Sequence, residues 1–234
     1  MSQFLVKPLF GGEMGLFTIT NATLWMALAV GASSLLLIGA VKQRALVPGR
    51  AQSVAELLYG FVRQLVVDIT GEEGLKYFPY IFTLFVFILF SNLLGMLPYS
   101  FAVTSHIAVT GVLALMVFVT VTAIGFIKHG AHFLGFFWPK DAPGPLRPVL
   151  MVIELISYFV RPISHSIRLG ANMLAGHAVL KVFAGFVGAL GVFGVVPLAA
   201  MVGLTAFEFL VAVIQAYVFA ILTCVYLNDA LHMH

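Results

Sequence analysis

The sequence predicts an all-α integral membrane protein. Its 234 residues are 62% hydrophobic and only 9% charged, a composition that leaves a soluble fold too little polar surface. Several uncharged runs are long enough to cross a bilayer, and the basic residues gather in alternate connections between these runs. We therefore expect about five membrane helices and one amphipathic helix on the cytoplasmic surface, with the last two spans forming a long, strongly tilted hairpin in a single membrane domain.

Composition also excludes several classes of function. The net charge is +3 and the basic residues are scattered, so the chain has no electrostatic footprint for nucleic acid. Its one cysteine, Cys224, can form neither an internal disulfide nor a zinc–cysteine site.

The first three spans follow from apolar length. After an outside N-terminal segment, 1–22, the run 23–41 is too long for a signal-peptide core and is taken as a retained span. Residues 77–127 carry no Lys, Arg, Asp or Glu, and this run is about twice the roughly 20 residues that one crossing needs. The chain must therefore fold back once, which gives spans at 78–97 and 107–127.

The last apolar block divides at a glycine-rich turn into helices at 148–188 and 193–228. At 1.5 Å per residue the first would be about 60 Å long, twice the thickness of the hydrocarbon core. It must tilt strongly or bend near Pro162, so we expect an oblique hairpin.

Residues 50–70 form the amphipathic helix, because their apolar side chains recur at helical spacing. This helix would lie along the cytoplasmic membrane surface, packed on lipid or on another subunit, or would serve as a plain connection.

Loop charges set the orientation, because positively charged loops stay in the cytoplasm. Among the loop cations, only Lys7 would lie outside. The expected topology therefore has five crossings, with the N-terminus outside and the C-terminus in the cytoplasm. The cytoplasmic cations are Lys42, Arg44, Arg50, Arg63, Lys76, Lys128, Lys140 and Arg147.

The hairpin carries an unusual load of ionisable residues. An Arg, Lys or Asp at the centre of a membrane helix costs roughly 2.5 to 3.5 kcal/mol, so function is the default explanation for such residues. They are Glu154, Arg161, Arg168, His177, Lys181 and Glu208.

Helical spacing divides these residues between two faces. Glu154, Arg161 and Arg168 follow one another by sevens and share a stripe with Asn172, whereas His177 points to the opposite side. Arginine stays protonated and cannot relay protons, so Arg168 would be a fixed positive barrier.

The titratable candidates for proton transfer are His177 and Glu208, because imidazole and carboxyl groups can exchange protons near neutral pH. Gln215 lies on the face of Glu208 and suits positioning rather than relay.

Four polar residues have two open interpretations each. Arg161 and Lys181 either extend to the interface or take part in a channel. His165 either lines an inner channel or is a packing histidine, and Asn92 either bonds another helix or lines a channel.

Four segments now show a family resemblance. The run 166–177, Ser-Ile-Arg-Leu-Gly-Ala-Asn-Met-Leu-Ala-Gly-His, resembles the signature of subunit a of F-type ATP synthases. Asn92 to Pro98, Glu154, and the stretch from Glu208 through Gln215 to Leu227 resemble the same family in the same order. The resemblance covers roughly residues 50–227.

The resemblance implies a role for each of the matching residues. Arg168 would face the carboxylates of a rotating c-ring, with Asn172 and Gln215 as polar neighbours. The remaining matches would divide between two offset aqueous half-channels. Asn92, His177 and Glu208 would line the outer one, and Glu154 would belong to the inner one.

The resemblance further implies a proton-translocating stator subunit of the bacterial cytoplasmic (inner) membrane. Its partners would be the c-ring, the peripheral-stalk b subunits, the rest of the ATP synthase and membrane lipid. The subunit itself would be non-catalytic and hold no cofactor.

This chain departs from the family pattern at three positions. Some members have an acid at the His177 position and a histidine at the Glu208 position, so this chain has the reversed pair. Gly95 stands where some members have an aspartate, so a relay through that position is doubtful.

Other classes fit less well. A proton-coupled secondary transporter with a midplane Arg/Glu site is the alternative, but the related halves typical of such transporters are missing from the sequence. Hydrolase motifs are also missing. His129 and His132 have metal-compatible spacing but stand beside a Gly- and Pro-rich loop without acids, so we expect no metal site.

Overall fold

The computed structural model describes residues 8, 18–42, 49–97, 100–130, 133, 135, 138 and 146–232. Most of segment 1–22 lies outside this set, as do Lys7, Arg44, Pro98, His132 and Lys140. The described helices are α1 (Asn21–Lys42), α2 (Arg50–Thr70), α3 (Phe78–Gly95), α4 (Ile107–His129), α5 (Arg147–Ala189) and α6 (Val195–Leu231). Short 3₁₀ turns precede α3, α4 and α6: η2 (Glu72–Tyr77), η3 (Val103–Ser105) and η6 (Gly191–Gly194).

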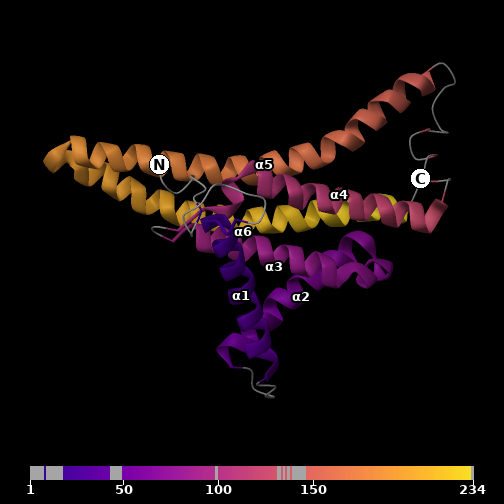
Figure 1. Ribbon diagram of the computed structural model, residues 1–234, viewed down its shortest axis with the longest axis horizontal. Coiled ribbons are helices and arrows are strands. Elements are labelled where there is room, and N and C mark those ends of the chain that lie inside the picture. Colours follow the sequence, from indigo (N-terminus) through magenta and orange to yellow (C-terminus); the bar gives the residue numbers. More distant parts are fainter. Residues whose placement is uncertain are drawn as a thin grey trace.

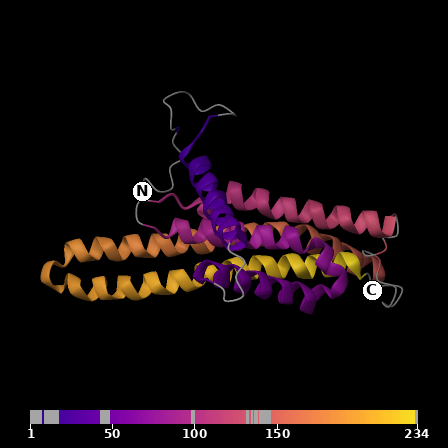
Figure 2. The same cartoon turned by 90° about the horizontal axis from the view of Figure 1, so that it is seen from below.

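Helices α3, α4, α5 and α6 lie side by side, while α1 projects from this bundle at a steep angle (Figures 1 and 2). The α5–α6 hairpin extends well beyond the other helices at its closed end (Figure 1). Helix α6 lies at the centre of the packing, where Ala216, Phe219, Ala220 and Cys224 are almost fully buried. Small residues on α6 allow its neighbours to approach closely, as is usual between membrane helices.

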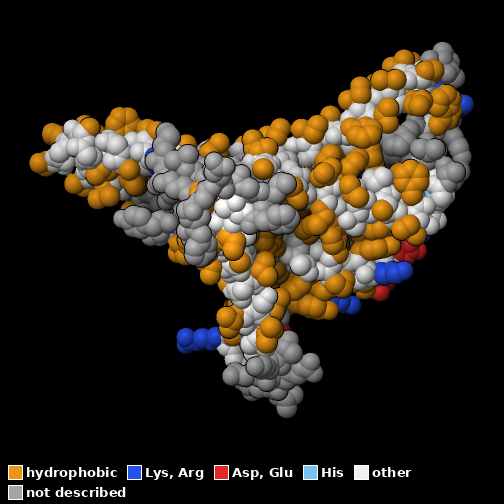
Figure 3. Space-filling view, in the orientation of Figure 1, with side chains coloured by type: hydrophobic (Ala, Val, Ile, Leu, Met, Phe, Trp, Pro, Cys, Tyr) orange, Lys and Arg blue, Asp and Glu red, His pale blue; other side chains and the backbone are white. Residues whose placement is uncertain are grey.

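Within the described residues, five helical segments are long and apolar enough to cross a membrane. They contain α1, α3, α4, α5 and α6, and α2 is not among them. On the face shown in Figure 3, hydrophobic side chains far outnumber charged ones. The predicted fold class, an all-α membrane protein, is confirmed.

Helix α2 buries one apolar side and leaves polar side chains such as Arg63 and Gln64 exposed. Val62 and Val66 are fully buried, whereas Leu57 on another side of the helix is 72% exposed. The buried face packs on α1, α3 and α6, so part of the apolar stripe is satisfied within this chain.

Helix α5 is one continuous helix of 43 residues, about 65 Å long. It curves along its length (Figure 1) and contains Pro162, which removes one backbone hydrogen bond and favours bending. The reversal into α6 uses Gly191, whose φ of +56° is a conformation that other residues rarely adopt.

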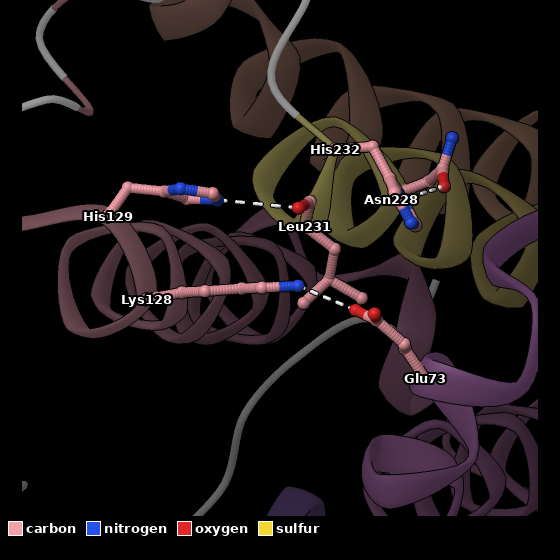
Figure 4. A network of polar contacts seen from close by, with 6 residues as sticks. All are labelled: Glu73, Lys128, His129, Asn228, Leu231 and His232. Atoms are coloured by element: carbon pink, nitrogen blue, oxygen red, sulfur yellow. Dashed lines mark hydrogen bonds and ion pairs between the residues drawn. The ribbon is translucent and has the colours of Figure 1, made fainter.

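Polar contacts tie three helix ends together at the open end of the bundle (Figure 4). Lys128 at the end of α4 forms an ion pair of 2.6 Å with Glu73 of η2. The imidazole of His129 lies 3.3 Å from the carbonyl oxygen of Leu231 at the end of α6. These contacts fix α4 against both the start of α3 and the end of α6.

Candidate functional site

Arg168 lies at the midpoint of α5 with its side chain on the exposed side of the helix. The opposite side of α5 is held by α4. There the hydroxyls of Ser166 and Thr110 are hydrogen-bonded at 3.2 Å. A Cβ at Gly170 would come within 3.3 Å of Thr110 Oγ1, so the glycine permits the close approach. The packed side of α5 therefore turns Arg168 away from α4.

A second polar contact joins α5 to α6 one turn beyond Arg168. The Asn172 side-chain amide donates a hydrogen bond of 2.8 Å to Gln215 Oε1. Gln215 is only 4% exposed, so the burial of its amide oxygen is compensated by this bond. The structure thus places Gln215 of α6 against Asn172, which follows Arg168 by one turn on α5.

His177 and Glu208 line one cavity of about 360 Å³ between α5 and α6. Lys181 joins them there, on the same face of α5 as His177. The remaining lining residues are Met96, Leu97, Leu180, Ala184, Met201 and Thr205. A cavity of this size holds several waters, and its lining offers an acid, an imidazole and an ammonium group.

Gly176 gives the Glu208 side chain its place beside α5. A Cβ on Gly176 would lie 2.9 Å from Glu208 Cδ and 3.2 Å from its Cγ, closer than carbon atoms normally approach. The carboxyl group therefore occupies the space that the absent side chain leaves free.

Asn92 is fully buried and bridges α3 to α6 rather than lining this cavity. Its amide nitrogen donates a hydrogen bond of 3.1 Å to the carbonyl oxygen of Ala212. Of its two interpretations, the helix-to-helix bond is the one that the structure displays.

Glu154 lies half-buried near the beginning of α5, two turns before Arg161. Arg161 forms an ion pair of 2.8 Å with Asp229 near the end of α6. Sequence reasoning left Arg161 open and missed Asp229 as a functional candidate. No local signal could reveal this pair, because its partners lie 68 residues apart.

His165 is buried among aromatic rings of α6. It is 2% exposed, and its ring lies 3.8 Å from the Phe219 ring and 5.9 Å from the Tyr226 ring, measured between centroids. Across the described residues, no group of three or more His, Cys, Asp or Glu side chains is placed to hold a metal ion.

The arrangement separates two kinds of chemistry. Arg168 is a permanent cation on an open face of α5, where it can attract an anionic group from another chain. His177 and Glu208 occupy a separate cavity, where imidazole and carboxyl groups can exchange protons with water.

Comparisons with known proteins show the family of this chain. The family model described as ATP synthase A chain matches residues 22–228. The ATP synthase subunit a of Dinoroseobacter shibae is 64% identical over 237 residues, which cover 100% of this chain and 94% of the relative. That of Paracoccus denitrificans is 64% identical (99% and 94% covered), and that of Rhodospirillum rubrum is 54% identical (100% and 98% covered). With a polar motif on α5 and α6 and matches along nearly its whole length, the chain belongs to the ATP synthase A chain family, the subunit a of ATP synthases.

Proposed function

We propose that this chain is the proton-translocating stator subunit of a rotary ATP synthase. The observation that carries the proposal is the exposed Arg168 at the midpoint of a membrane helix about 65 Å long. A lone cation facing lipid there would cost several kcal/mol. A carboxylate on a neighbouring rotor removes that cost, because opposite charges stabilise each other strongly away from water.

The rotor would be a ring of small proteolipid subunits, the c-ring. Apolar side chains that flank Arg168 on α5 leave a surface that such a ring would cover. Ile163 is 57% exposed, Ile167 51% and Leu174 43%. Peripheral-stalk b subunits and the remaining ATP synthase subunits would complete the assembly.

Two offset half-channels would deliver and remove the proton. The cavity around His177 and Glu208 supports an outer path, with Asn92 on the adjacent helix α3. Glu154, near the other end of α5, would serve the inner path. The chain would transform no substrate itself, since its task is to move protons for a complex that synthesises ATP.

Charge explains why the two paths must be separated. A rotor carboxylate has to be neutralised by a proton before it enters lipid, because the ionised form is too costly to bury. Arg168 would hold the ionised form between the two paths and block direct proton leakage. Asn172 and Gln215 would keep that region polar and ordered through their hydrogen bond.

The distribution of loop cations supports a cytoplasmic membrane location with segment 1–22 outside and the C-terminus inside. In that topology the network of Glu73, Lys128 and Leu231 would lie at the cytoplasmic end of the bundle.

The test measures ATP-driven proton pumping by the complete ATP synthase in inverted membrane vesicles. Arg168→Ala is expected to abolish pumping while the complex still assembles, because the exposed side chain contributes charge rather than core packing. Arg63→Ala is the matched control, since it removes an exposed arginine from α2. Normal pumping by assembled Arg168→Ala complexes would contradict the proposal. Repeating the assay with and without sodium distinguishes the transported ion.

A further inference from the structure

Two arginines on α5 share a stripe but have different surroundings. Arg161 and Arg168 are separated by seven residues and therefore point in similar directions. Among the described residues, Arg161 is ion-paired with Asp229 and its side chain is 21% exposed. Arg168 takes part in neither of the two ion pairs found there, and it is exposed.

Arg161 is also held by aromatic rings. Its guanidinium carbon lies 5.5 Å from the ring centre of Tyr158 and 5.0 Å from that of Tyr226, within the range of cation–π attraction. The Tyr158 hydroxyl is hydrogen-bonded to Thr122 of α4 at 2.6 Å. Asp229 thus completes a set of contacts that keeps this guanidinium turned toward α6.

We propose that Asp229 acts as a specificity-determining counter-ion, which occupies Arg161 so that Arg168 meets the rotor carboxylate without competition from a second cation. This inference rests on the proposed function and deepens it. An arginine side chain is long and flexible. Without Asp229, Arg161 is a second unpaired cation two turns from Arg168 on nearly the same stripe of α5.

A second free cation would disturb the transport cycle. It would favour the ionised form of the rotor carboxylate beside the inner path, where ATP-driven pumping requires the acid to take up a proton. A neighbouring cation lowers the pKa of a carboxyl group by about one or more. A decrease of about one in the pKa of the rotor carboxyl lowers the fraction that is protonated about tenfold. Acidifying the inner compartment would restore loading.

A plain structural clamp predicts a different result. If the ion pair serves only to join α5 to α6, Asp229→Asn is slow because the hairpin loosens around an unpaired charge, and acidifying the external medium does not restore its pumping. If the pair serves to neutralise Arg161, removing both charges also removes the competitor.

The experiment compares Asp229→Asn with the double variant Arg161→Gln and Asp229→Asn, in complete ATP synthase in inverted vesicles. Asp229→Asn is expected to pump about tenfold more slowly at neutral pH and to recover as the external medium, which corresponds to the cytoplasm, is acidified. The double variant is expected to pump within about twofold of the wild type. Asp229→Glu keeps the counter-ion and is expected to pump normally.

Glu73→Gln is the matched control, because it breaks the ion pair between Glu73 and Lys128. Among the described residues this is the other ion pair, and it lies away from the α5 stripe. Copurification of the proteolipid ring measures assembly. If Asp229→Asn does not assemble, the double variant carries the test.

An assembled Asp229→Asn complex with normal pumping would overturn the inference, and so would an assembled double variant that is as slow as Asp229→Asn. These outcomes differ from failure of the proposed function, in which the wild-type complex itself would pump no protons.

Discussion

Replacing Gly176 by alanine tests whether the exact place of the Glu208 carboxyl group matters. The new Cβ would lie 2.9 Å from Glu208 Cδ and closer still to Oε1, and ordinary contact begins near 3.4 Å, so the carboxyl group must move by at least about 0.5 Å. The displaced atoms lie at the end of a flexible side chain, so the substitution should cost the fold little stability. The group that moves, however, lies in the cavity with His177.

The expected effect is on transport rather than on assembly. Misplacing a reacting group by 1 Å can lower a rate about 100-fold, so half that displacement corresponds to about tenfold. Under the proposed function, proton transfer between the cavity and the rotor should therefore slow by at least this factor in Gly176→Ala. ATP-driven pumping in inverted vesicles measures the rate, and the amount of assembled complex is measured in the same membranes.

Gly185→Ala is the matched control on the same helix. A Cβ there meets no atom within 4 Å among the described residues, and alanine is the better helix former. Pumping should be unchanged in this variant. Equal rates in the two variants, at equal assembly, would refute the argument that Gly176 makes room for a working carboxyl group.

Two further predictions concern stability. Asn92→Ala should lower the stability of the detergent-solubilised protein by about 2 kcal/mol, because it removes the bond to Ala212 and leaves a small cavity; an unchanged thermal midpoint would count against this. Burial lowers the pKa of His106, which stacks on Phe101 just before α4, so the unfolded chain binds the proton more readily. Stability should therefore fall as the pH drops below about 6.5, and His106→Phe should remove that part of the slope. If the thermal midpoint of the wild type and that of the variant change equally between pH 7.5 and 5.5, the assignment is contradicted.

The membrane character of this protein could be predicted from its sequence because the bilayer imposes simple rules. A span needs about 20 apolar residues, and every backbone group must be paired within the helix, so uncharged length alone indicates the helices. The same reasoning indicated that the apolar run of α5 exceeds one direct crossing. The grouping of Arg168 with Asn172 also follows from helical spacing, because both lie on one helix.

Contacts between helices were decided only by the tertiary structure. Local spacing could not show that Asn172 bonds Gln215 across 43 residues, or that Arg161 meets Asp229 across 68. Such pairs depend on the rotation and axial shift of one helix against another, which small residues such as Gly170 and Gly176 control through close approach. The sequence by itself determined which segments enter the membrane and which side chains carry charge there, since these depend on composition along one helix. The packing of α5 against α6 determined that Arg161 is paired with Asp229 and that Arg168 stays exposed.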